Sequence, residues 1–377
     1  MTFCFFTAQY LPTPGGVERY TWNLARRCKA AGHRVLIVTS ALPGQPARER
    51  DADGLEIYRL PVFPVMGGRF PVLRPFAPAS DLWAQAIDFA VIQTRMYTQS
   101  IWAARQCRKR GIPALVIDHS TGYMMHGGLG GILGRWYEHF ACALIRRCGF
   151  PFYGVSQDVC RWLRTFGITA AGTLPNAVDP DELALLARAE PRTDWRETLQ
   201  VPDGGHLVAF VGRLIPEKGA LPLAKAVQQL PGCVLAVAGT GPEEEALRAF
   251  GETVHVLGAL PHRQIIQLLD QADCYCLPTE YAEGFPTTLL EAAACRCPIV
   301  CTHTAGTAEL LPGQDCAVYL DDTRPETLAA ALGTVLDAPE AAQRRADHAL
   351  QNLQAHFTWQ AVFATMMKTA QDAQTRR

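Results

Sequence analysis

Short runs of hydrophobic residues alternate along this chain with longer segments in which hydrophobic side chains recur every three or four positions. The short runs predict buried β-strands, and the longer segments predict amphipathic helices. Strands that alternate with helices in this way form parallel sheets covered by helices. The pattern therefore predicts an α/β fold built on doubly wound parallel sheets.

The pattern of strands and helices occurs twice, and a polar segment rich in Pro, Asp and Glu separates the two series at 180–204. The predicted strands of the first series are 3–7, 35–39, 56–60, 89–93, 115–117 and 152–155. Those of the second series are 207–211, 233–238, 254–257, 272–278 and 297–301. We expect two domains, residues 1–180 and 181–355, and a C-terminal helix at 356–377 that packs back towards the first domain.

The composition fits a globular protein without a strongly charged partner. Of the 377 residues, 49% are hydrophobic, which is enough for two cores, and the formal net charge is -1. Such a charge gives no reason to expect nucleic acid as a partner. The N-terminal segment reads as a first strand rather than a signal peptide, and no segment reaches the ~18 apolar residues of a membrane span. We expect a cytoplasmic protein, which allows association with the inner face of the membrane.

The cysteines indicate a reducing compartment. All 13 lie outside C-x-x-C pairs, and their odd number cannot pair fully within one chain. Cys295, Cys297 and Cys301 are the candidate metal ligands, but they straddle a helix end and a strand without a suitably spaced histidine. Buried structural thiols are the favoured interpretation, and no metal site is expected.

The segment from Glu283 to Glu291 lies between two predicted strands and carries candidate chemistry. Gly284 and Pro286 mark a loop, and the chain from Thr287 onwards favours a helix, so free amides at the helix start can face a ligand. The two carboxylates can accept hydrogen bonds from hydroxyl groups, while the amides can donate to phosphate oxygens. A sugar nucleotide carries both kinds of group.

Two cations are expected at the same edge of the second sheet. Arg213 and Lys218 follow its first strand, and the planar fork of arginine beside the point charge of lysine suits a diphosphate. The alternative is a pair of surface cations on a loop. Gly306 and Thr307 follow a later strand, where small residues before a helix start can form a phosphate cradle. Gly239-Thr-Gly lacks the third glycine of a dinucleotide fingerprint, so nicotinamide is not expected.

In the first domain, Gly15 and Gly16 lie in the turn between the first strand and the first helix. Backbone amides can approach a ligand there, although many such turns are merely tight. His119 follows the strand at 115–117 and is the best candidate for an acid or base. The alternative is that His119 only hydrogen-bonds the adjacent glycine-rich loop at 127–134.

A helix predicted at 136–147 has an apolar side and basic neighbours, Arg135, Arg146 and Arg147. A basic, aromatic face allows peripheral contact with an anionic membrane, but a solvated helix face is the favoured interpretation. The long loop at 63–78 is expected to be functional or mobile.

Five motifs taken together resemble the family 4 retaining glycosyltransferases of the GT-B architecture (glycosyl transferases group 1). They are Gly15-Gly-Val-Glu, Pro175-Asn-Ala-Val-Asp, Val211-Gly-Arg-Leu-Ile-Pro-Glu-Lys-Gly, Gly239-Thr-Gly-Pro-Glu-Glu and the segment from Glu283 to Glu291. Their order and spacing span nearly the whole chain. The resemblance implies two Rossmann-like domains facing across a cleft, the first binding the acceptor and the second the nucleotide sugar. It also implies catalysis without a metal or another cofactor.

By matched position, the resemblance implies catalytic roles for His119 near the reacting sugar, for Arg213 and Lys218 on the departing diphosphate, and for Glu283 on sugar hydroxyls. Glu291 would accept hydrogen bonds from the ribose. The remaining donor-binding positions are Gly15, Gly16, Gly284, Phe285, Pro286, Thr287, Gly306 and Thr307. Retention without an evident carboxylate nucleophile implies a same-face displacement in which the departing phosphate takes the acceptor proton.

Three departures from the family pattern are visible. Arg296 stands where relatives commonly have glycine before a strand, so the turn differs or an extra cation lies near the cleft. Ala177 replaces another frequent glycine. Thr121 and Tyr123 add bulk around His119 and would shape the sugar or acceptor pocket.

The implied activity is transfer of a hexosyl or N-acetylhexosaminyl group from a nucleotide sugar, a UDP-sugar before a GDP-sugar. The acceptor would be a glycan or a lipid-linked molecule in the synthesis of surface polysaccharide, lipopolysaccharide or glycolipid. The alternatives are a GT-B enzyme that makes a small soluble glycoside and a non-catalytic nucleotide-sugar-binding subunit of a synthase complex. The complete set of charged site residues argues against the last of these.

Overall fold

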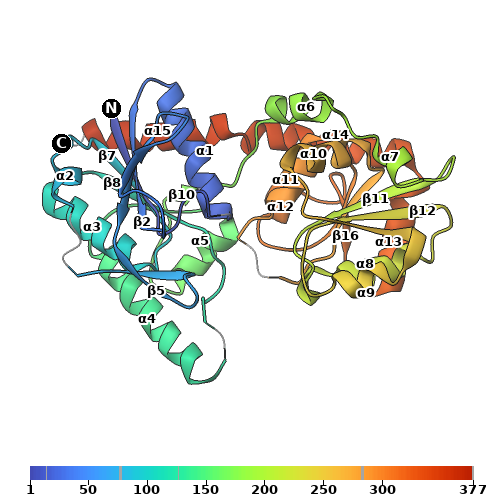
Figure 1. The fold of residues 1–377 in the computed structure, drawn as a ribbon, viewed down its shortest axis with the longest axis horizontal. Helices are drawn as coiled ribbons and strands as arrows, with labels where there is room; N and C mark the ends of the chain where they lie inside the picture. Colours follow the sequence, from blue (N-terminus) through green and yellow to red (C-terminus); the bar gives the residue numbers. More distant parts are fainter. Residues whose placement is uncertain (14, 76–78, 126, 282–283, 376–377) are drawn as a thin grey trace. The chain divides into compact units, whose positions relative to one another are not determined.

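The computed structural model describes residues 1–13, 15–75, 79–125, 127–281 and 284–375. The chain forms two compact units (Figure 1). Unit 1 comprises Met1–Asn176 and Trp359–Arg377, and unit 2 comprises Ala177–Thr358. The observed boundaries lie close to those expected at 180 and 355. The predicted α/β class is confirmed, because each unit is a mainly parallel sheet covered by helices.

In the part of the chain that the structure describes, unit 1 forms an eight-stranded sheet in the order β10-β9-β8-β7-β1-β2-β4-β3, parallel except for β3 against β4. Its strands are β1 (Thr2–Phe6), β2 (Arg34–Ser40), β3 (Arg48–Arg50), β4 (Glu56–Leu60), β7 (Phe89–Gln93), β8 (Ala114–Asp118), β9 (Phe152–Gly154) and β10 (Gly172–Thr173). The helices are α1 (Gly16–Ala30), α2 (Ser80–Trp83), α3 (Thr98–Arg110), α4 (Gly128–Arg146), α5 (Gln157–Arg164) and α15 (Trp359–Thr375). The central strands are mainly apolar and almost entirely buried because helices cover both faces of the sheet.

Within the described residues of unit 2, a six-stranded parallel sheet has the order β13-β12-β11-β14-β15-β16. Its strands are β11 (His206–Val211), β12 (Cys233–Ala238), β13 (Val254–Gly258), β14 (Cys274–Leu277), β15 (Ile299–Thr302) and β16 (Val318–Leu320). The α-helices are α6 (Pro180–Arg188), α7 (Trp195–Thr198), α8 (Ala220–Val227), α9 (Glu244–Arg248), α10 (His262–Gln271), α11 (Thr287–Ala294), α12 (Thr307–Leu310), α13 (Pro325–Leu336) and α14 (Pro339–His356). Short 3-10 turns span Pro216–Lys218 and Gly251–Thr253.

The cysteines are free thiols in the two cores, buried except for the half-buried Cys295. This confirms the interpretation of the cysteines as buried structural residues. Burial raises the pKa of Cys301 to about 12, which keeps that thiol protonated.

The glycine-rich segment at 127–134 is helical and not a loop. Helix α4 begins at Gly128, eight residues before the predicted start at Trp136. Gly134 lies on the buried side, where a Cβ atom would stand only 2.9 Å from the side chain of Met125. Close packing of the preceding loop therefore overrides the low helix propensity of glycine.

The segment expected to be a loop at 63–78 contains a β-hairpin instead. Strands β5 (Val62–Val65) and β6 (Phe70–Leu73) pair antiparallel. The ring of Phe70 packs edge-on against Tyr137 of α4, with centroids 5.7 Å apart, so the hairpin lies beside α4 (Figure 1). Several prolines and a Gly67–Gly68 pair obscure this hairpin in the sequence.

Gly239 and Gly241 allow two loops of unit 2 to pack backbone against backbone. A Cβ atom at Gly239 would stand 1.8 Å from the carbonyl oxygen of Gly212, and one at Gly241 would stand 2.3 Å from that of Leu214. The amide of Leu214 donates to Thr240 at 2.9 Å. This motif therefore holds the loop after β11 and has a structural role.

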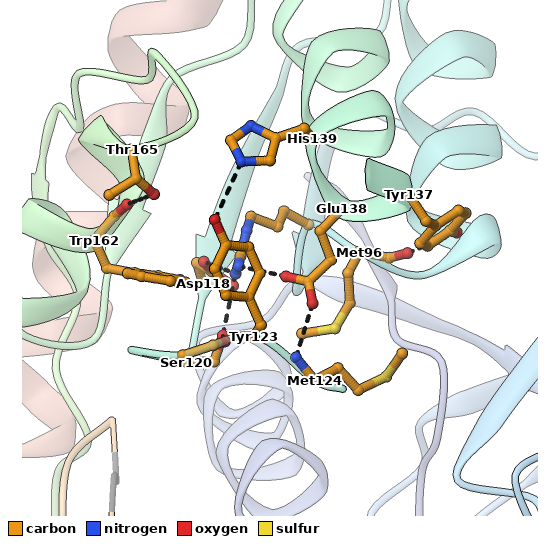
Figure 2. Close-up of polar contacts among 12 residues, drawn as sticks. Met96, Asp118, Ser120, Tyr123, Met124, Tyr137, Glu138, His139, Trp162 and Thr165 are labelled. Atoms are coloured by element: carbon orange, nitrogen blue, oxygen red, sulfur yellow. Dashed lines mark hydrogen bonds and ion pairs between the residues drawn. The ribbon is translucent and has the colours of Figure 1, made fainter. Parts of the chain in front are cut away.

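A buried ionic network joins three elements of unit 1 (Figure 2). Arg95, just after β7, donates to Asp118 at the end of β8 at 2.5 Å and to Glu138 of α4 at 2.9 Å. All three side chains are fully buried. Glu138 also accepts from the amide of Met124 at 2.8 Å, so the loop after β8 is bonded to α4. Burial raises the pKa of the Asp118 and Glu138 carboxyl groups, and the Arg95 guanidinium opposes that rise.

Helix α15 packs on α1 within unit 1. Trp359 contacts the ring of Tyr20, with centroids 5.2 Å apart, and the guanidinium of Arg27 lies over the Trp359 ring. The hydroxyl groups of Thr369 and Tyr153 are 2.9 Å apart.

Arg296 lies in the turn before β15, at the amino end of that strand, and has a φ of 56°. Its guanidinium donates twice to Asp347 of α14, at 2.6 and 2.8 Å. The turn therefore keeps a left-handed residue although that residue is not glycine, and the Arg296 guanidinium is bonded to α14.

Replacing Arg95 by leucine should strongly destabilise unit 1, because two buried carboxyl groups would lose their cation. The free energy of unfolding should fall by about 3–5 kcal/mol in a denaturant titration. The matched control is Arg34→Leu, which removes a half-exposed pair with Glu56 and should cost less than about 1 kcal/mol. An equal decrease in the free energy of unfolding for the two variants would contradict the larger contribution that we assign to the buried network.

Replacing Arg296 by glycine should stabilise the protein, because glycine adopts the left-handed conformation at little cost. We expect a gain of about 0.5–1 kcal/mol in the free energy of unfolding. Arg296→Ala keeps the backbone strain while losing the bonds to Asp347, and should show no gain. A drop in stability for the glycine variant would mean that the ion pair outweighs the strain.

Candidate functional site

The loops that follow β11 and β14 lie side by side at the carboxyl edge of the sheet in unit 2, meaning the edge where the parallel strands end. These strands are neighbours although they are separated in sequence, so the strand order reverses direction here. The amide of Glu280 donates to the carbonyl of Glu217 at 2.8 Å, and the Thr279 hydroxyl donates to the same oxygen at 3.2 Å. Open α/β sheets bind ligands at such switch points.

Arg213 and Lys218 meet in this region. Both cations lie over the ring of Tyr281, with distances to its centroid of 4.8 Å for the Arg213 guanidinium carbon and 5.4 Å for Lys218 Nζ. Lys218 is buried, and this burial together with the positive charge of Arg213 lowers its pKa to about 8. A buried lysine beside another cation would be stabilised by an arriving anion, so the chemistry of the pair suits an anionic ligand.

Glu291 lies on α11 and is held by a residue that the sequence did not single out. The Nε2–H of His262, the first residue of α10, donates to the Glu291 carboxylate at 2.8 Å. The exposed fraction of the Glu291 side chain is 12%, against 32% for His262. The position of His262, directly after β13 at the same sheet edge, is the signal that could have identified it.

Glu283 lies outside the described residues. After it, Pro286 is the N-cap residue of α11 and Thr287 begins the helix, as expected from the helix signal. The ring of Phe285 is buried against Phe357, with centroids 5.4 Å apart.

The turn at Gly306 packs against the same aromatic side chain. Gly306 has a φ of 81°, and a Cβ atom there would stand 2.4 Å from the Phe285 ring. The amide of Thr307 donates to the Thr304 carbonyl at 3.1 Å, and its hydroxyl donates to the same oxygen at 2.6 Å. Two segments that were predicted separately as donor-binding are thus brought into direct contact.

In unit 1, Gly15 is the N-cap residue of α1 and Gly16 is the first residue of that helix, which follows β1. The Glu18 carboxylate folds back over this turn, and a Cβ atom at Gly15 would stand 2.0 Å from Glu18 Oε2. Glu18 is buried, and burial raises the pKa of its carboxyl group. The carboxylate lies near the positive end of α1, which favours its ionised form.

His119 lies at the carboxyl edge of the sheet in unit 1, just after β8. The His119 Nε2 atom is 2.8 Å from Oε1 of Gln93, the last residue of β7, and its ring contacts the edge of Tyr20 at a centroid distance of 4.9 Å. With Gln93 accepting, the proton is on Nε2 and Nδ1 is an acceptor. Burial lowers the pKa of His119 to about 3, so the imidazole is neutral at neutral pH. Gln93 and Tyr20 are site residues that the sequence did not reveal.

Thr121 and Tyr123 follow His119 in the loop that leads to α4. Tyr123 packs edge-on against Trp162, with centroids 4.9 Å apart, and its hydroxyl is 3.2 Å from His139 Nε2 (Figure 2). Its bulk therefore joins α4 and α5. Among the described residues, no group of three or more His, Cys, Asp or Glu side chains could hold a metal ion.

Two family models match the chain in succession. The model described as Glycosyltransferase Family 4 matches residues 14–182, and the model described as Glycosyl transferases group 1 matches residues 191–351. Between them they cover most of both units.

Individual glycosyltransferases are similar to this chain in sequence or in fold. Glycogen synthase from Mycobacterium tuberculosis is 27% identical over 386 residues, which cover 92% of this chain and 89% of that protein. The phosphatidylinositol N-acetylglucosaminyltransferase GPI3 subunit of Saccharomyces cerevisiae is 23% identical, over 87% of this chain and 73% of the subunit. The crystal structure of HepE from Anabaena in complex with UDP is 18% identical, with a TM-score of 0.77 over 99% of this chain and 100% of HepE. In sequence and in fold, the chain belongs to the family 4 glycosyltransferases and has the GT-B fold.

Proposed function

We propose that the protein is a retaining, metal-independent glycosyltransferase that moves a hexosyl or N-acetylhexosaminyl group from a nucleotide sugar to a glycan or lipid-linked acceptor. The observation that carries the proposal is the paired Arg213 and Lys218 at the switch point of unit 2. A UDP-sugar is the preferred donor, which the UDP complex of HepE supports, and a GDP-sugar is the second choice.

The two cations would stabilise the departing nucleoside diphosphate. Breaking the bond between sugar and phosphate increases the negative charge on the phosphate oxygens. The guanidinium of Arg213 can bind two oxygens at once, and Lys218 adds a compact charge. Lys218 is already buried and lies over the Tyr281 ring, whereas Arg213 is exposed, so the lysine needs little reorganisation when the charge develops.

The other unit 2 residues would hold the donor by its hydroxyl groups. Glu291 would accept from the ribose, with its carboxylate oriented by His262. We assign the sugar hydroxyls to Glu283, and phosphate contacts to the amides between Gly284 and Thr287 and at the Gly306 turn. These assignments would place donor binding in unit 2.

Unit 1 would contribute the acceptor side of the reaction. The Gly15–Gly16 turn would approach the donor phosphates. His119 is neutral, so its role is to accept or donate a hydrogen bond near the reacting sugar and not to supply a proton as imidazolium. The departing phosphate would then take the acceptor proton during a same-face displacement.

The names of two relatives support the proposed acceptor class. One relative is named for the synthesis of glycogen, and the other is named as a subunit of a phosphatidylinositol N-acetylglucosaminyltransferase. We favour a role in surface polysaccharide, lipopolysaccharide or glycolipid synthesis on the cytoplasmic side of a membrane. Accumulation of a small soluble glycoside as the product, or donor binding without any transfer, would favour the alternatives.

Removing the buried cation should abolish most of the rate. We expect Lys218→Ala to lower kcat by about 10²–10³-fold, equivalent to about 3 kcal/mol, in an assay of nucleoside diphosphate release from the donor. Lys225 on α8 is exposed, so Lys225→Ala is the matched control and should keep the wild-type rate. Near-normal turnover of Lys218→Ala would exclude the assigned role.

Binding of a nucleoside diphosphate should weaken at alkaline pH. Lys218 has a pKa of about 8 in the free protein, and a bound diphosphate would raise that pKa. The affinity should therefore be highest below pH 8, where Lys218 is protonated, and should fall as the pH rises and Lys218 deprotonates. Calorimetric titration with UDP should give an affinity about tenfold lower at pH 9 than at pH 7. Lys218→Arg, which stays charged throughout, should bind equally at both pH values. The same pH dependence in this variant would assign the titration to another group.

A further inference from the structure

The exposed apolar side chains of this protein are concentrated on one part of unit 1. Of the ten exposed large apolar side chains among the described residues, eight lie on α4 or on the β5–β6 hairpin. We call these eight residues the apolar face: Phe63, Val65, Met66, Leu129, Ile132, Leu133, Trp136 and Phe140. Exposed apolar patches of this kind mark interaction sites.

The spacing of the residues on α4 places them in one stripe. Leu129, Leu133, Trp136 and Phe140 are separated by four, three and four residues, which aligns them along one side of a helix. Trp136 is 76% exposed and Leu129 is 80% exposed. The core-facing side of the helix instead carries small residues together with Glu138 of the ionic network. Helix α4 therefore has a side that packs on the core of unit 1 and a second, apolar side. No element among the described residues covers this second side.

The hairpin extends this stripe. Strand β6 packs on α4 through Phe70 and Tyr137, and the exposed Phe63 and Met66 belong to the same hairpin. In Figure 1 the hairpin labelled β5 and the long helix α4 form the same end of unit 1.

The exposed charges within the two segments that form the apolar face have one sign. Residues 61–75 contain no Asp or Glu, and the only acid within 127–147 is the buried Glu138. The exposed charged side chains of the same segments are arginines: Arg69, Arg74, Arg135, Arg146 and Arg147. An apolar stripe that includes tryptophan and is bordered by arginine complements a bilayer with anionic headgroups.

We propose that the apolar face docks unit 1 onto an anionic lipid bilayer. The inference deepens the proposed function, because it rests on a lipid-linked acceptor and names the surface that would reach it. Docking would bury the apolar side chains at the level of the headgroups, with the arginines on the lipid phosphates. No described helix is long and apolar enough to cross a membrane, so the contact proposed is peripheral.

The docking helix is bonded to the loop that carries His119. Glu138 of α4 accepts from the Met124 amide and from Arg95, while Arg95 also bonds Asp118, the residue before His119 (Figure 2). The apolar face and this loop therefore belong to one rigid block, so docking would hold the acceptor side of unit 1 at a fixed height above the bilayer.

Cosedimentation of the full-length protein with vesicles tests the proposal. Vesicles of phosphatidylglycerol and phosphatidylcholine should bind the protein, with binding that weakens as salt is added, and vesicles of phosphatidylcholine alone should bind it less. Leu133→Glu and, separately, Val65→Glu should each lower the partition coefficient by roughly tenfold or more.

The matched control is Leu185→Glu, which places the same charge at a 73% exposed leucine of α6 in unit 2. This variant should bind vesicles like the wild type. Equal binding of wild type and Leu133→Glu, or no binding of the wild type to anionic vesicles, would overturn the proposal. A wild-type dimer in sedimentation velocity that Leu133→Glu dissociates would assign the face to a second copy of the chain and would also overturn it.

A separate measurement distinguishes failure of this proposal from failure of the proposed function. UDP binding by calorimetry and the melting temperature should be the same in wild type and Leu133→Glu, because the anion site lies in unit 2. Vesicle binding without UDP binding would leave the docking face standing and remove the proposed activity. UDP binding without vesicle binding would overturn the docking proposal and leave the proposed activity standing.

Discussion

The direction of the strands is the constraint on which the candidate site depends. Because the strands of the unit 2 sheet run parallel, every loop that follows a strand emerges at one edge. The strand order then makes β11 and β14 neighbours and brings the loop of Arg213 and Lys218 beside the loop that carries Tyr281. The same rule places the Gly15–Gly16 turn and His119 at one edge of unit 1.

The cation pair of unit 2, for which we propose an anionic ligand, includes one unfavourable interaction. Burying Lys218 next to Arg213 costs free energy, which appears as the lowered pKa of the lysine. The Tyr281 ring and the fixed backbone around Gly212 hold the cations in place despite this cost. An arriving anion would remove the repulsion, so the energy stored in the fold favours binding of a charged ligand.

In unit 1, the buried ionic network links surface and site. Arg95 joins the ends of β7 and β8 to α4, so the loop with His119 and the helix with the exposed stripe are fixed to each other. Such a network is costly to desolvate and specifies one arrangement only when every charge has its partner. The side of α4 that carries Glu138 is therefore anchored to Arg95 and to the Met124 amide.

The sequence by itself determined the α/β class, the approximate strands and the positions of Arg213, Lys218, His119 and the glycine turns. These features depend on local periodicity and on which residues follow a strand, and neither requires knowledge of distant contacts. Only the tertiary structure decided the partners: Tyr281 for the two cations, His262 for Glu291, Gln93 for His119 and Glu138 for Arg95. It also decided that the glycine-rich segment is helical and which side of α4 is exposed. Each of these outcomes joins residues that are far apart in the chain, where burial and packing override the local preference.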